Sequence, residues 1–462
     1  MSSSSAPDLS QECALYPLSC GGLPVASLYP NAYFFGMSNL GFHALCRLVG
    51  EGSGTTLERF CLESMKGKQV RSLERGFDLG RMRIILATVS YEEDSLNLMH
   101  ILRRAGIEPD RKKRKSPFIL AGGSFVTIAP KVLSRIADAL YLGYMGNEEK
   151  KELQEIFSDK NLSRQSILKK LESIKGIFIP GEAKEENISF PLNIFEQSLY
   201  LARDTEFSRM YLMEIGRGCP FRCRFCTTGH LYPHVSWRRA EDVFEVFDDV
   251  ESRHPGKVQS IGLVAPVPNR HPDIKRILEN FCRKGKAVSL SSIRAAGTDK
   301  EFFQLLRACR QRSFTIAPEV PGEDDRERMG KKIADAEIFR CLEDARSAGF
   351  RQVKMYFLTG CEGMRSREDV TCLEKFLNKV PDDMRVKLSF NPVVPKPGTS
   401  LQKRTMPLSA DIKNLMKQIR KSLSRKTNVK LKFGSLKRFY IQYKIANGDE
   451  ETLFEMFGGL KE

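Results

Sequence analysis

The sequence lacks any long apolar run. Nowhere in its 462 residues do 18 apolar side chains follow one another, whereas a helix needs about 20 to cross a bilayer. The first nine residues contain four serines and no basic segment ahead of an apolar one, unlike a secretory signal. We therefore expect a protein that is neither anchored in a membrane nor exported, and we predict a cytoplasmic location.

Acidic residues are also in short supply. Asp and Glu number 57 against 74 Lys and Arg, which gives a formal net charge of +17. Such an excess permits attraction to nucleic acid or to another polyanion. The densest basic run is Arg111-Lys-Lys-Arg-Lys115, between an expected helix and an expected strand. This run is either a solvated loop or a polyanion contact.

Nine of the twelve cysteines are scattered singly, which is typical of reduced thiols. The other three, Cys219, Cys223 and Cys226, follow one another at spacing C-x3-C-x2-C. A 4Fe-4S cluster normally takes four thiolates. Three close cysteines therefore either use a distant fourth ligand or leave one iron for a non-protein ligand. Structural zinc is the alternative, with His230 and His234 completing the ligand set.

Residues 28–158 alternate between expected strands and expected helices. Gly36 to Gly41 predicts the start of a helix, with a serine or asparagine as its cap. A second helix is expected at Glu92 to Ala105. The expected strands are Tyr29 to Phe35, Arg83 to Val89, Pro117 to Ser124 and Asp138 to Gly143. This alternation predicts a doubly wound, Rossmann-like sheet that binds a ligand at its carboxyl edge.

Residues 159–208 are polar and rich in Lys and Glu, and we expect a helix followed by an interdomain linker. Residues 209–400 contain six strand-helix units, which predict a partial (β/α)6 TIM-type barrel. Residues 401–462 are expected to form a small α+β C-terminal cap. The predicted fold class is therefore α/β with three parts.

Polar residues follow several strands of the expected barrel. Arg294 ends the third strand, Glu319 ends the fourth, and Lys354 lies in the fifth. Catalytic residues of such barrels lie at the carboxyl ends of the strands. Lys354 is either a barrel-interior ion pair or a base, and Glu319 either binds a ligand or pairs with Arg294.

The cysteine spacing, with the aromatic Phe225 before the last cysteine, resembles the radical S-adenosylmethionine (SAM) superfamily. Further segments resemble a functionally uncharacterised subfamily with an N-terminal cobalamin-binding-type domain, and the resemblance covers about residues 28 to 458. These segments are Gly36-Met-Ser-Asn-Leu-Gly41, Ile85-Leu-Ala-Thr-Val-Ser-Tyr-Glu92, Leu120-Ala-Gly-Gly123, Tyr141-Leu-Gly143 and Ala317-Pro-Glu319.

The resemblance implies an enzyme with a 4Fe-4S cluster on Cys219, Cys223 and Cys226. It implies reductive cleavage of SAM to a 5′-deoxyadenosyl radical, with electrons from a flavodoxin-type or ferredoxin-type donor. Cobalamin-dependent methyl transfer to an unknown substrate is a further implication. The residues implied for SAM are Phe225, Arg294 and Glu319, and those implied for a corrinoid are Ser90, Gly122 and Gly123.

The sequence departs from the family pattern at several positions. None of its six histidines lies in the Asp-x-His-x-x-Gly loop that supplies a lower axial ligand to cobalt. His43 is the nearest candidate, and a core role is the alternative for it. The Gly-Gly-Glu motif of the superfamily is replaced by Ala265-Pro-Val-Pro-Asn-Arg270. Cys361, after the fifth strand, is a fourth ligand, a substrate-side thiol or a buried spectator.

Two other functions remain open. Val394-Pro-Lys-Pro-Gly-Thr399 resembles the last-strand segment of tRNA methylthiotransferases, but the cysteines of a second cluster are absent from the N-terminal domain. A non-catalytic, metal-stapled interaction protein is the alternative from another class. The sequence does not identify the substrate.

Overall fold

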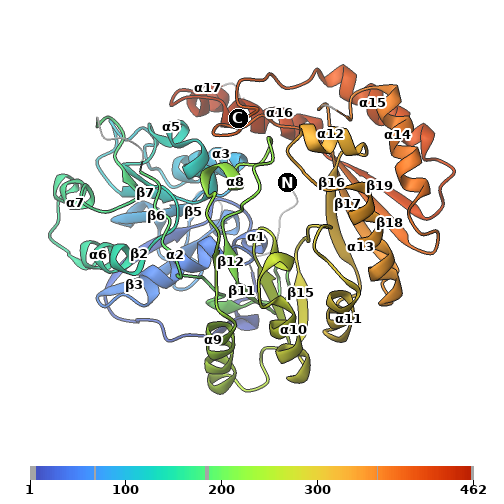
Figure 1. Ribbon diagram of the computed structural model, residues 1–462. Coiled ribbons are helices and arrows are strands. Elements are labelled where there is room, and N and C mark those ends of the chain that lie inside the picture. The colour runs from blue at the N-terminus through green and yellow to red at the C-terminus, as the bar shows by residue number, and fades with distance from the viewer. Residues whose placement is uncertain (1–6, 67–68, 183–186, 362, 459–462) are drawn as a thin grey trace. The chain divides into compact units, whose positions relative to one another are not determined.

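The computed structural model describes residues 7–66, 69–182, 187–361 and 363–458 (Figure 1). The chain divides into two compact units. Unit 1 comprises Met1–Tyr211 and Lys444–Glu462, and unit 2 comprises Leu212–Tyr443. Among the described residues, no helix combines the length and the apolar character needed to cross a membrane.

Unit 1 is built around a six-stranded sheet in the order β3-β2-β6-β7-β8-β9. The first five strands are parallel, and β9 is antiparallel to β8. Numbered among the parallel strands alone, this order is 2-1-3-4-5, the flavodoxin-like doubly wound topology. The bounds are β2 (Leu23–Leu28), β3 (Thr55–Phe60), β6 (Ile84–Thr88), β7 (Phe118–Gly122), β8 (Ala139–Tyr141) and β9 (Ile177–Phe178).

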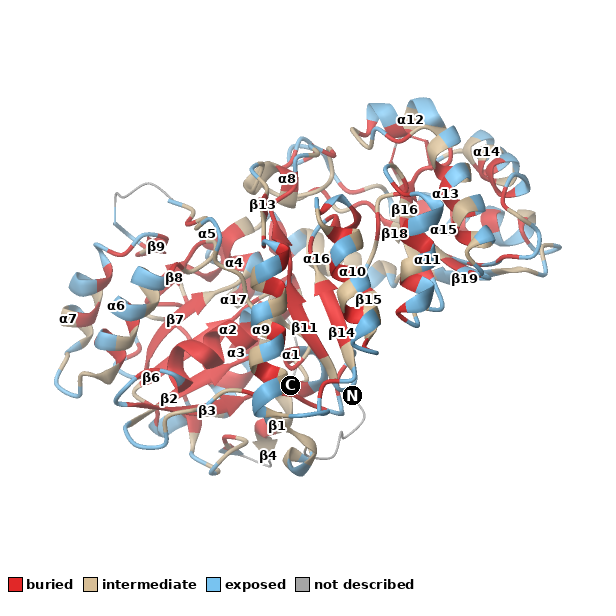
Figure 2. Ribbon diagram, turned by 60° about the horizontal axis from the view of Figure 1, so that its bottom comes forward, coloured by how far each residue is buried: buried red, intermediate tan, exposed pale blue. Residues whose placement is uncertain are grey.

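Helices cover both faces of this sheet. One face packs its apolar side chains, including Val25, Leu86 and Leu120, against α2, α6 and α7. The helices α3, α4 and α5 lie outside that cluster, on the other side of the sheet, where α4 contacts β7 and β8. The strands between the two layers are buried along most of their length (Figure 2). The helices are α1 (Tyr33–Gly36), α2 (Leu40–Gly50), α3 (Glu92–Arg104), α4 (Ser124–Ile128), α5 (Pro130–Leu133), α6 (Asn147–Ser158) and α7 (Arg164–Leu171).

Most elements expected in this part of the chain are present. The expected cap of α2 is Asn39, whose side chain accepts a hydrogen bond from the Phe42 backbone N–H. The strand expected at Tyr29 to Phe35 is wrong. The first strand is β2, which ends at Leu28, and the aromatic residues that follow it form a turn and the short helix α1. Tyr29 and Tyr33 are buried there against neighbouring elements, so their apolar character reflects packing and not strand formation.

The segment 159–208, expected to be a linker, contributes structure to unit 1. It contains α7, the sheet strand β9, and β10 (Tyr200–Leu201), which pairs with β1 (Cys13–Ala14). The end of the chain also returns to unit 1. There α17 (Thr452–Gly458) packs against α3, where the Arg103 guanidinium lies 4.3 Å from the centre of the Phe457 ring.

Unit 2 contains a three-stranded sheet, β11-β14-β15, and a four-stranded parallel sheet, β16-β17-β18-β19. A parallel bridge between Ile293 and Ile316 connects the two sheets. This arrangement is consistent with the expected partial barrel. The strands are β11 (Met210–Glu214), β14 (Ser260–Val264), β15 (Ala287–Leu290), β16 (Phe314–Glu319), β17 (Gln352–Thr359), β18 (Arg385–Pro392) and β19 (Val429–Phe433).

Helices alternate with these strands along the chain. They are α9 (Ala240–Arg253), α10 (Ile274–Arg283), α11 (Lys300–Ala308), α12 (Glu323–Arg328), α13 (Asp335–Ser347), α14 (Arg367–Asn378), α15 (Ser409–Ser422) and α16 (Leu436–Ala446). The strand β19 lies within the stretch expected to form a separate cap. It pairs in parallel with β18 from Val429 to Phe433 and so belongs to the sheet of unit 2.

Candidate functional site

The three clustered cysteines lie on a loop that is closed at its base by two short strands. The strand β12 (Gly216–Arg217) pairs antiparallel with β13 (Ser236–Trp237). Gly216 must be a glycine here, because a Cβ would lie 2.2 Å from the Trp237 ring. The loop begins where β11 ends, so the thiols lie beyond the carboxyl end of a strand.

The loop is folded tightly on itself. The Cys219 backbone N–H donates to the Tyr232 carbonyl at 2.9 Å. Gly218 has φ +78°, and a Cβ there would lie 1.9 Å from the His234 carbonyl oxygen. The short helix α8 (Thr228–Leu231) forms part of the loop, and the His230 Nε2 atom lies 3.2 Å from the Cys223 carbonyl oxygen. The backbone thus fixes the positions of the three cysteines.

The cysteines and histidines of this loop do not form a single-ion site. Within the described ranges, no group of three or more His, Cys, Asp or Glu side chains is arranged to bind one metal ion. In particular, His230 and His234 do not complete a zinc site with the cysteines. The donor set that remains consists of three thiols.

Two cations lie in the electrostatic surroundings of these thiols. Burial raises the pKa of Cys219 and raises that of Cys223 to about 11, while Lys331 and Arg294 act in the opposite direction. A metal ligand must be a thiolate, and nearby positive charge stabilises that form. The two cations therefore offset part of the cost of burying thiolates at these positions.

Arg294 lies just after β15 and is held from three directions. Its guanidinium lies 3.8 Å from the centre of the Phe221 ring, and it donates to the Lys332 carbonyl. Its backbone N–H donates to Asn269 Oδ1 at 2.9 Å, and Asn269 Nδ2 donates back to the Arg294 carbonyl at 2.9 Å. The arginine is thereby fixed beside the cysteine loop.

Glu319 ends β16 and is buried, with φ +71° next to an irregularity in the strand pairing. Its carboxylate pairs with Lys331 at 3.2 Å. The alternative that Glu319 pairs with Arg294 is therefore wrong. Burial raises the pKa of Glu319, and Lys331 opposes that rise. A non-glycine residue with positive φ at a strand end is uncommon and is typical of a constrained site.

Lys331 reaches the site because its segment packs on the cysteine loop. The Arg224 backbone N–H donates to the Met329 carbonyl at 3.0 Å. Gly330 follows, where a Cβ would lie 2.9 Å from the Arg222 carbonyl oxygen. Sequence reasoning missed Lys331, because its distance from the cysteines along the chain hides this contact. It also missed Asn269, although a lone asparagine in place of the usual motif was a usable signal.

The other candidate residues of unit 2 have less defined surroundings. Phe225, which lies between Cys223 and Cys226 in the sequence, is half-buried. Lys354 contacts the hydroxyl and ring of Tyr356 and has no carboxylate partner among the residues described, so the ion-pair interpretation is wrong. Cys361 is buried, and burial raises the pKa of its thiol to about 12. That environment fits a buried spectator.

In unit 1, the topology directs attention to the edge between β2 and β6. Ligands of doubly wound sheets bind where the strand order reverses, outside the carboxyl ends of the strands. Ser90 lies at that point and accepts a hydrogen bond from Asn39 at 3.1 Å. The buried Asp94 accepts from the backbone N–H groups of Ser90 and Tyr91 at 3.0 and 2.9 Å. Burial raises the pKa of Asp94 to about 6.

Exposed aromatic rings flank this edge. Phe34, Phe35 and Tyr91 are 42%, 46% and 59% exposed, which is unusual for large apolar side chains. Phe34 and Phe35 follow β2, and Tyr91 follows β6. The reversal point therefore presents flat apolar surface to the solvent.

The two candidate glycines differ in their roles. Gly123 has φ +114°, and a Cβ there would lie 2.5 Å from the Val89 carbonyl oxygen. Gly123 is therefore required for internal packing. A Cβ added at Gly122 would lie 3.4 Å from the Tyr141 Cβ, which is an ordinary van der Waals contact, so a side chain fits there.

His43 is a core residue. Its Nδ1 accepts from the Leu199 backbone N–H at 2.9 Å, and its Nε2 lies 3.0 Å from the Met37 carbonyl oxygen. Burial lowers the pKa of His43 to about 4. Because both ring nitrogens are occupied, His43 is not available as an axial ligand in this conformation.

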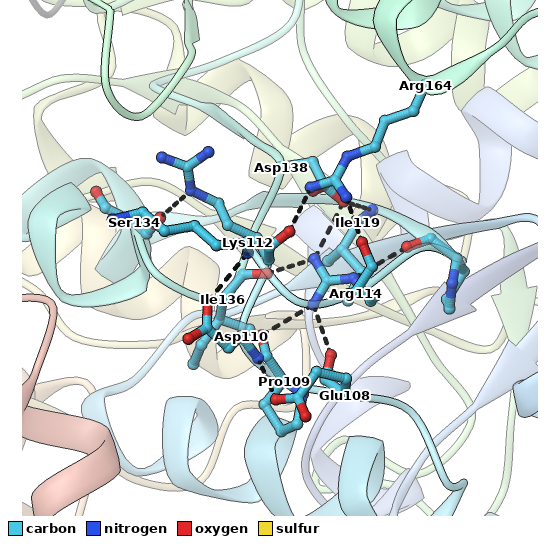
Figure 3. Close-up of polar contacts among 12 residues, drawn as sticks. Glu108, Pro109, Asp110, Lys112, Arg114, Ile119, Ser134, Ile136, Asp138 and Arg164 are labelled. Atoms are coloured by element: carbon cyan, nitrogen blue, oxygen red, sulfur yellow. Dashed lines mark hydrogen bonds and ion pairs between the residues drawn. The ribbon is translucent and has the colours of Figure 1, made fainter.

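The basic run at Arg111–Lys115 is partly a structural element (Figure 3). Arg114 is buried and donates to the carbonyls of Glu108, Pro109, Pro117 and Ile136 and to the Asp138 carboxylate. Arg111 donates to the carbonyls of Ser134 and Pro180. Only the three lysines of the run are exposed. Its arginines thus serve the fold, which weakens the case for a polyanion contact here.

Comparisons with known proteins agree with this division. Residues 213–370 match the family model of the radical SAM superfamily. Residues 41–180 match the model described as radical SAM proteins, N-terminal. The chain is 26% identical over 429 residues to the uncharacterised protein MJ0966 of Methanocaldococcus jannaschii, which covers 92% of this chain and 89% of that protein.

Two solved structures show a similar fold. One is TsrM of Kitasatospora setae, a radical SAM methyltransferase with cobalamin and a 4Fe-4S cluster bound. The TM-score is 0.55 at 14% identity, covering 82% of this chain and 77% of that chain. The other is OxsB, described as a cobalamin-dependent S-adenosylmethionine radical enzyme. The TM-score is 0.54 at 14% identity, covering 90% of this chain and 58% of that chain.

The chain combines a flavodoxin-like α/β unit with a parallel-sheet unit that carries the cysteine loop, and the radical SAM match indicates an enzyme. Residues 213–370 thus form a radical SAM domain, and residues 41–180 form the N-terminal domain found in radical SAM proteins. The cofactors of that superfamily are a 4Fe-4S cluster and SAM, and its members require a reducing electron donor.

Proposed function

We propose that Cys219, Cys223 and Cys226 bind the 4Fe-4S cluster and that this chain cleaves SAM reductively. The observation that carries the proposal is three thiols on one tightly folded loop with Arg294 and Lys331 beside them. When bound, a cluster of this kind supplies the electron that cleaves SAM to a 5′-deoxyadenosyl radical. The thiolates of these three cysteines would be the protein ligands of that cluster.

The residues around the loop have distinct roles in this proposal. Arg294 pairs with the carboxylate of SAM, because a guanidinium forms a charge-assisted pair with that group. Its contacts with Phe221 and Asn269 hold it in position before SAM arrives. Glu319 accepts hydrogen bonds from the ribose hydroxyls, and its ion pair with Lys331 favours the ionised carboxylate. Phe225 packs against the bound cofactor.

Unit 1 binds a corrinoid at the edge between β2 and β6 in this proposal, with Ser90 and Gly122 close to it. The strand-order reversal and the exposed rings of Phe34, Phe35 and Tyr91 support this placement. The likeness to the methyltransferase TsrM supports methyl transfer as the reaction, and the likeness to OxsB supports cobalamin as a cofactor. A corrinoid supplies methyl-transfer chemistry when bound, and in this chain it does so without His43. Gly123 lies at this edge, but its role is to allow close packing against the Val89 backbone and not to contact the corrinoid.

The reaction partners follow from the same chemistry. A flavodoxin-type or ferredoxin-type protein supplies the electron, and a reducing cytoplasm suits a cluster on three thiolates. The substrate is unassigned, and the charge of +17 admits nucleic acid. The methylthiotransferase and the metal-stapled interaction protein are outcomes that the following experiments separate from this proposal.

Anaerobic reconstitution of the full chain tests the cluster. We expect about four irons and four sulfides per chain and release of 5′-deoxyadenosine on reduction with dithionite. Joint replacement of Cys219, Cys223 and Cys226 by alanine should abolish both. The matched control replaces three other cysteines, Cys13, Cys20 and Cys372, none of which is fully buried. Iron retained in the first variant, or zinc without iron in the wild type, contradicts the proposal.

Cobalamin binding is tested separately. Hydroxocobalamin should remain bound to the reconstituted chain through gel filtration, and the paramagnetic Co(II) form should show no hyperfine splitting from an axial nitrogen. His43→Ala should leave the corrinoid content of the folded fraction unchanged. A chain that cleaves SAM but retains no corrinoid refutes methyl relay and leaves the cluster assignment intact. Transfer of sulfur to tRNA favours the methylthiotransferase.

A further inference from the structure

The four-stranded sheet of unit 2 has one face packed against helices. In β17 and β18 the buried side chains include Val353, Met355 and Phe357, and Val386, Leu388 and Phe390. The ring centre of Phe357 lies 6.0 Å from that of Phe376 in α14 and 5.6 Å from that of Phe390. Phe390 in turn stacks on Phe433, with 5.3 Å between the ring centres. The helices α14 and α15 lie on this side of the sheet (Figure 1). Successive side chains of a strand point to opposite faces, so the intervening residues lie on the other face.

That second face is basic. The register places Lys354 beside Lys387, and Lys387 beside Lys430. One step along the strands, Tyr356, Ser389 and Lys432 lie side by side, and one step in the other direction Gln352 lies beside Arg385. We call Lys354, Arg385, Lys387, Lys430 and Lys432 the basic face.

This pattern is unusual for a parallel sheet. Parallel strands are normally covered on both faces and consist of near-continuous apolar runs. Here β17 and β18 alternate apolar and polar residues instead. Like charges directly opposite each other on neighbouring strands destabilise a sheet, yet three lysines occupy one row. The arrangement lowers stability in the free protein, and an anionic ligand would relieve the repulsion.

The basic face has no internal counter-charge. Within the part of the chain that the structure describes, none of its five residues forms a salt bridge. Lys354 contacts Tyr356, and the other four side chains are exposed. The basic run in unit 1 differs, since its arginines are bonded to carbonyls and to Asp138. The basic face is therefore a row of cations that no described carboxylate neutralises within salt-bridge distance.

We infer that the basic face binds the phosphodiester backbone of a single-stranded nucleic acid, which is the substrate of this enzyme if the proposed function holds. Neighbouring strands lie about 4.8 Å apart, so the row Lys354-Lys387-Lys430 spans about 10 Å and faces successive phosphates of one strand. Tyr356 lies half-exposed on the same face, and an aromatic ring there provides a stacking surface for a base. Asn391, which is half-buried, adds a polar group on this side of β18.

The experiment measures fluorescence anisotropy of a fluorescein-labelled 12-nucleotide oligouridylate on the full chain, from 50 to 200 mM salt and without cofactors. The test variant is Lys387→Gln/Lys430→Gln. The matched control is Lys112→Gln/Lys113→Gln, which removes the same charge from exposed positions of unit 1. The salt slope is the change in the logarithm of the binding constant per tenfold change in salt concentration, and each lost phosphate contact lowers its magnitude by about 0.7. We therefore expect the test variant to lose about 1.4 in slope and about 10- to 30-fold in affinity at 0.1 M salt.

The control should bind within about twofold of the wild type, and Lys387→Arg/Lys430→Arg should retain binding because it preserves the charge. Circular dichroism checks the fold of each variant. Equal losses in the test and control variants, or a wild type that does not bind at 50 mM salt, refute the inference. Competition by uridine monophosphate at phosphate concentrations equal to those of the oligonucleotide shows a site for free phosphate and also refutes it.

The result is independent of the radical chemistry. Cleavage of SAM by reconstituted wild-type protein without oligonucleotide binding removes the basic face as a substrate surface and leaves the proposed function standing. Binding at the basic face by a chain that cannot be reconstituted with iron refutes the proposed function and leaves the basic face standing as a nucleic-acid site. The two failures are thus distinguishable.

Discussion

Replacement of the buried Arg114 by methionine should unfold unit 1 at markedly lower denaturant than wild type. The guanidinium makes five hydrogen bonds, four to carbonyl oxygens at 2.9, 3.0, 3.0 and 2.6 Å and one to Asp138 at 3.1 Å. Both side chains of the pair are fully buried. Methionine fills a similar volume but donates nothing, so the acceptors around it lose their partner.

The expected magnitude follows from this count. Removing one partner of a buried ion pair costs about 3 to 5 kcal/mol. Arg164 also pairs with Asp138, which places the expected loss toward the lower end of that range. With a urea dependence of about 3 kcal/mol per M for a unit of this size, the midpoint falls by about 1 to 2 M.

Hydrogen exchange in the β7 and β8 peptides, followed by mass spectrometry across a urea series, measures the stability of unit 1 directly. The single tryptophan, Trp237, belongs to unit 2, so its fluorescence reports on the other unit in the same samples. Lys113→Met is the control, because it removes one exposed positive charge from the same run. If Arg114→Met shifts the midpoint by no more than Lys113→Met does, the run is a solvated loop and the structural interpretation is wrong.

Three further predictions concern other residues. Burial lowers the pKa of His43 from 6.5 to about 4, so the stability contributed by the neutral ring is complete above pH 6.5 and is lost as the pH falls toward 4, by about 3 kcal/mol. In His43→Gln the urea midpoint should therefore change less between pH 6.5 and pH 4 than in the wild type. The same pH dependence in both proteins contradicts this prediction. Gly123→Ala should cost about 1 to 3 kcal/mol from backbone strain alone, whereas Gly122→Ala should lower the melting temperature far less. Glu319→Gln should weaken SAM binding by about 1.5 to 3 kcal/mol if the carboxylate accepts the ribose hydroxyls; an unchanged Kd with a lower melting temperature assigns Glu319 to its pair with Lys331 alone.

The sequence predicted the elements whose signals are local. The apolar runs of β6, β7 and β8 and the asparagine cap of α2 were identified within a residue or two. The cysteine spacing is equally local, since all three residues belong to one loop. The strand expected at Tyr29 to Phe35 failed because aromatic residues are buried in turns as well as in strands.

Features that depend on distant contacts were not predictable. β9 and β10 each have two residues, too few for any periodicity, so their segment looked like a linker. Lys331 joins the candidate site because the Arg224 backbone N–H bonds to the Met329 carbonyl, and no sequence pattern in either segment predicts this contact. The basic face depends on strand register, because Lys354, Lys387 and Lys430 become neighbours only when three strands align.

The return of α17 to unit 1 has a consequence for biosynthesis. Unit 2 is inserted between two pieces of unit 1, so the ribosome completes the unit 1 sheet long before it makes the helix that covers α3. At about 5 to 20 residues per second, synthesis of the intervening unit takes roughly 10 to 50 s. During that interval the α3 surface that later receives Phe457 is uncovered and open to chaperones or to another nascent chain.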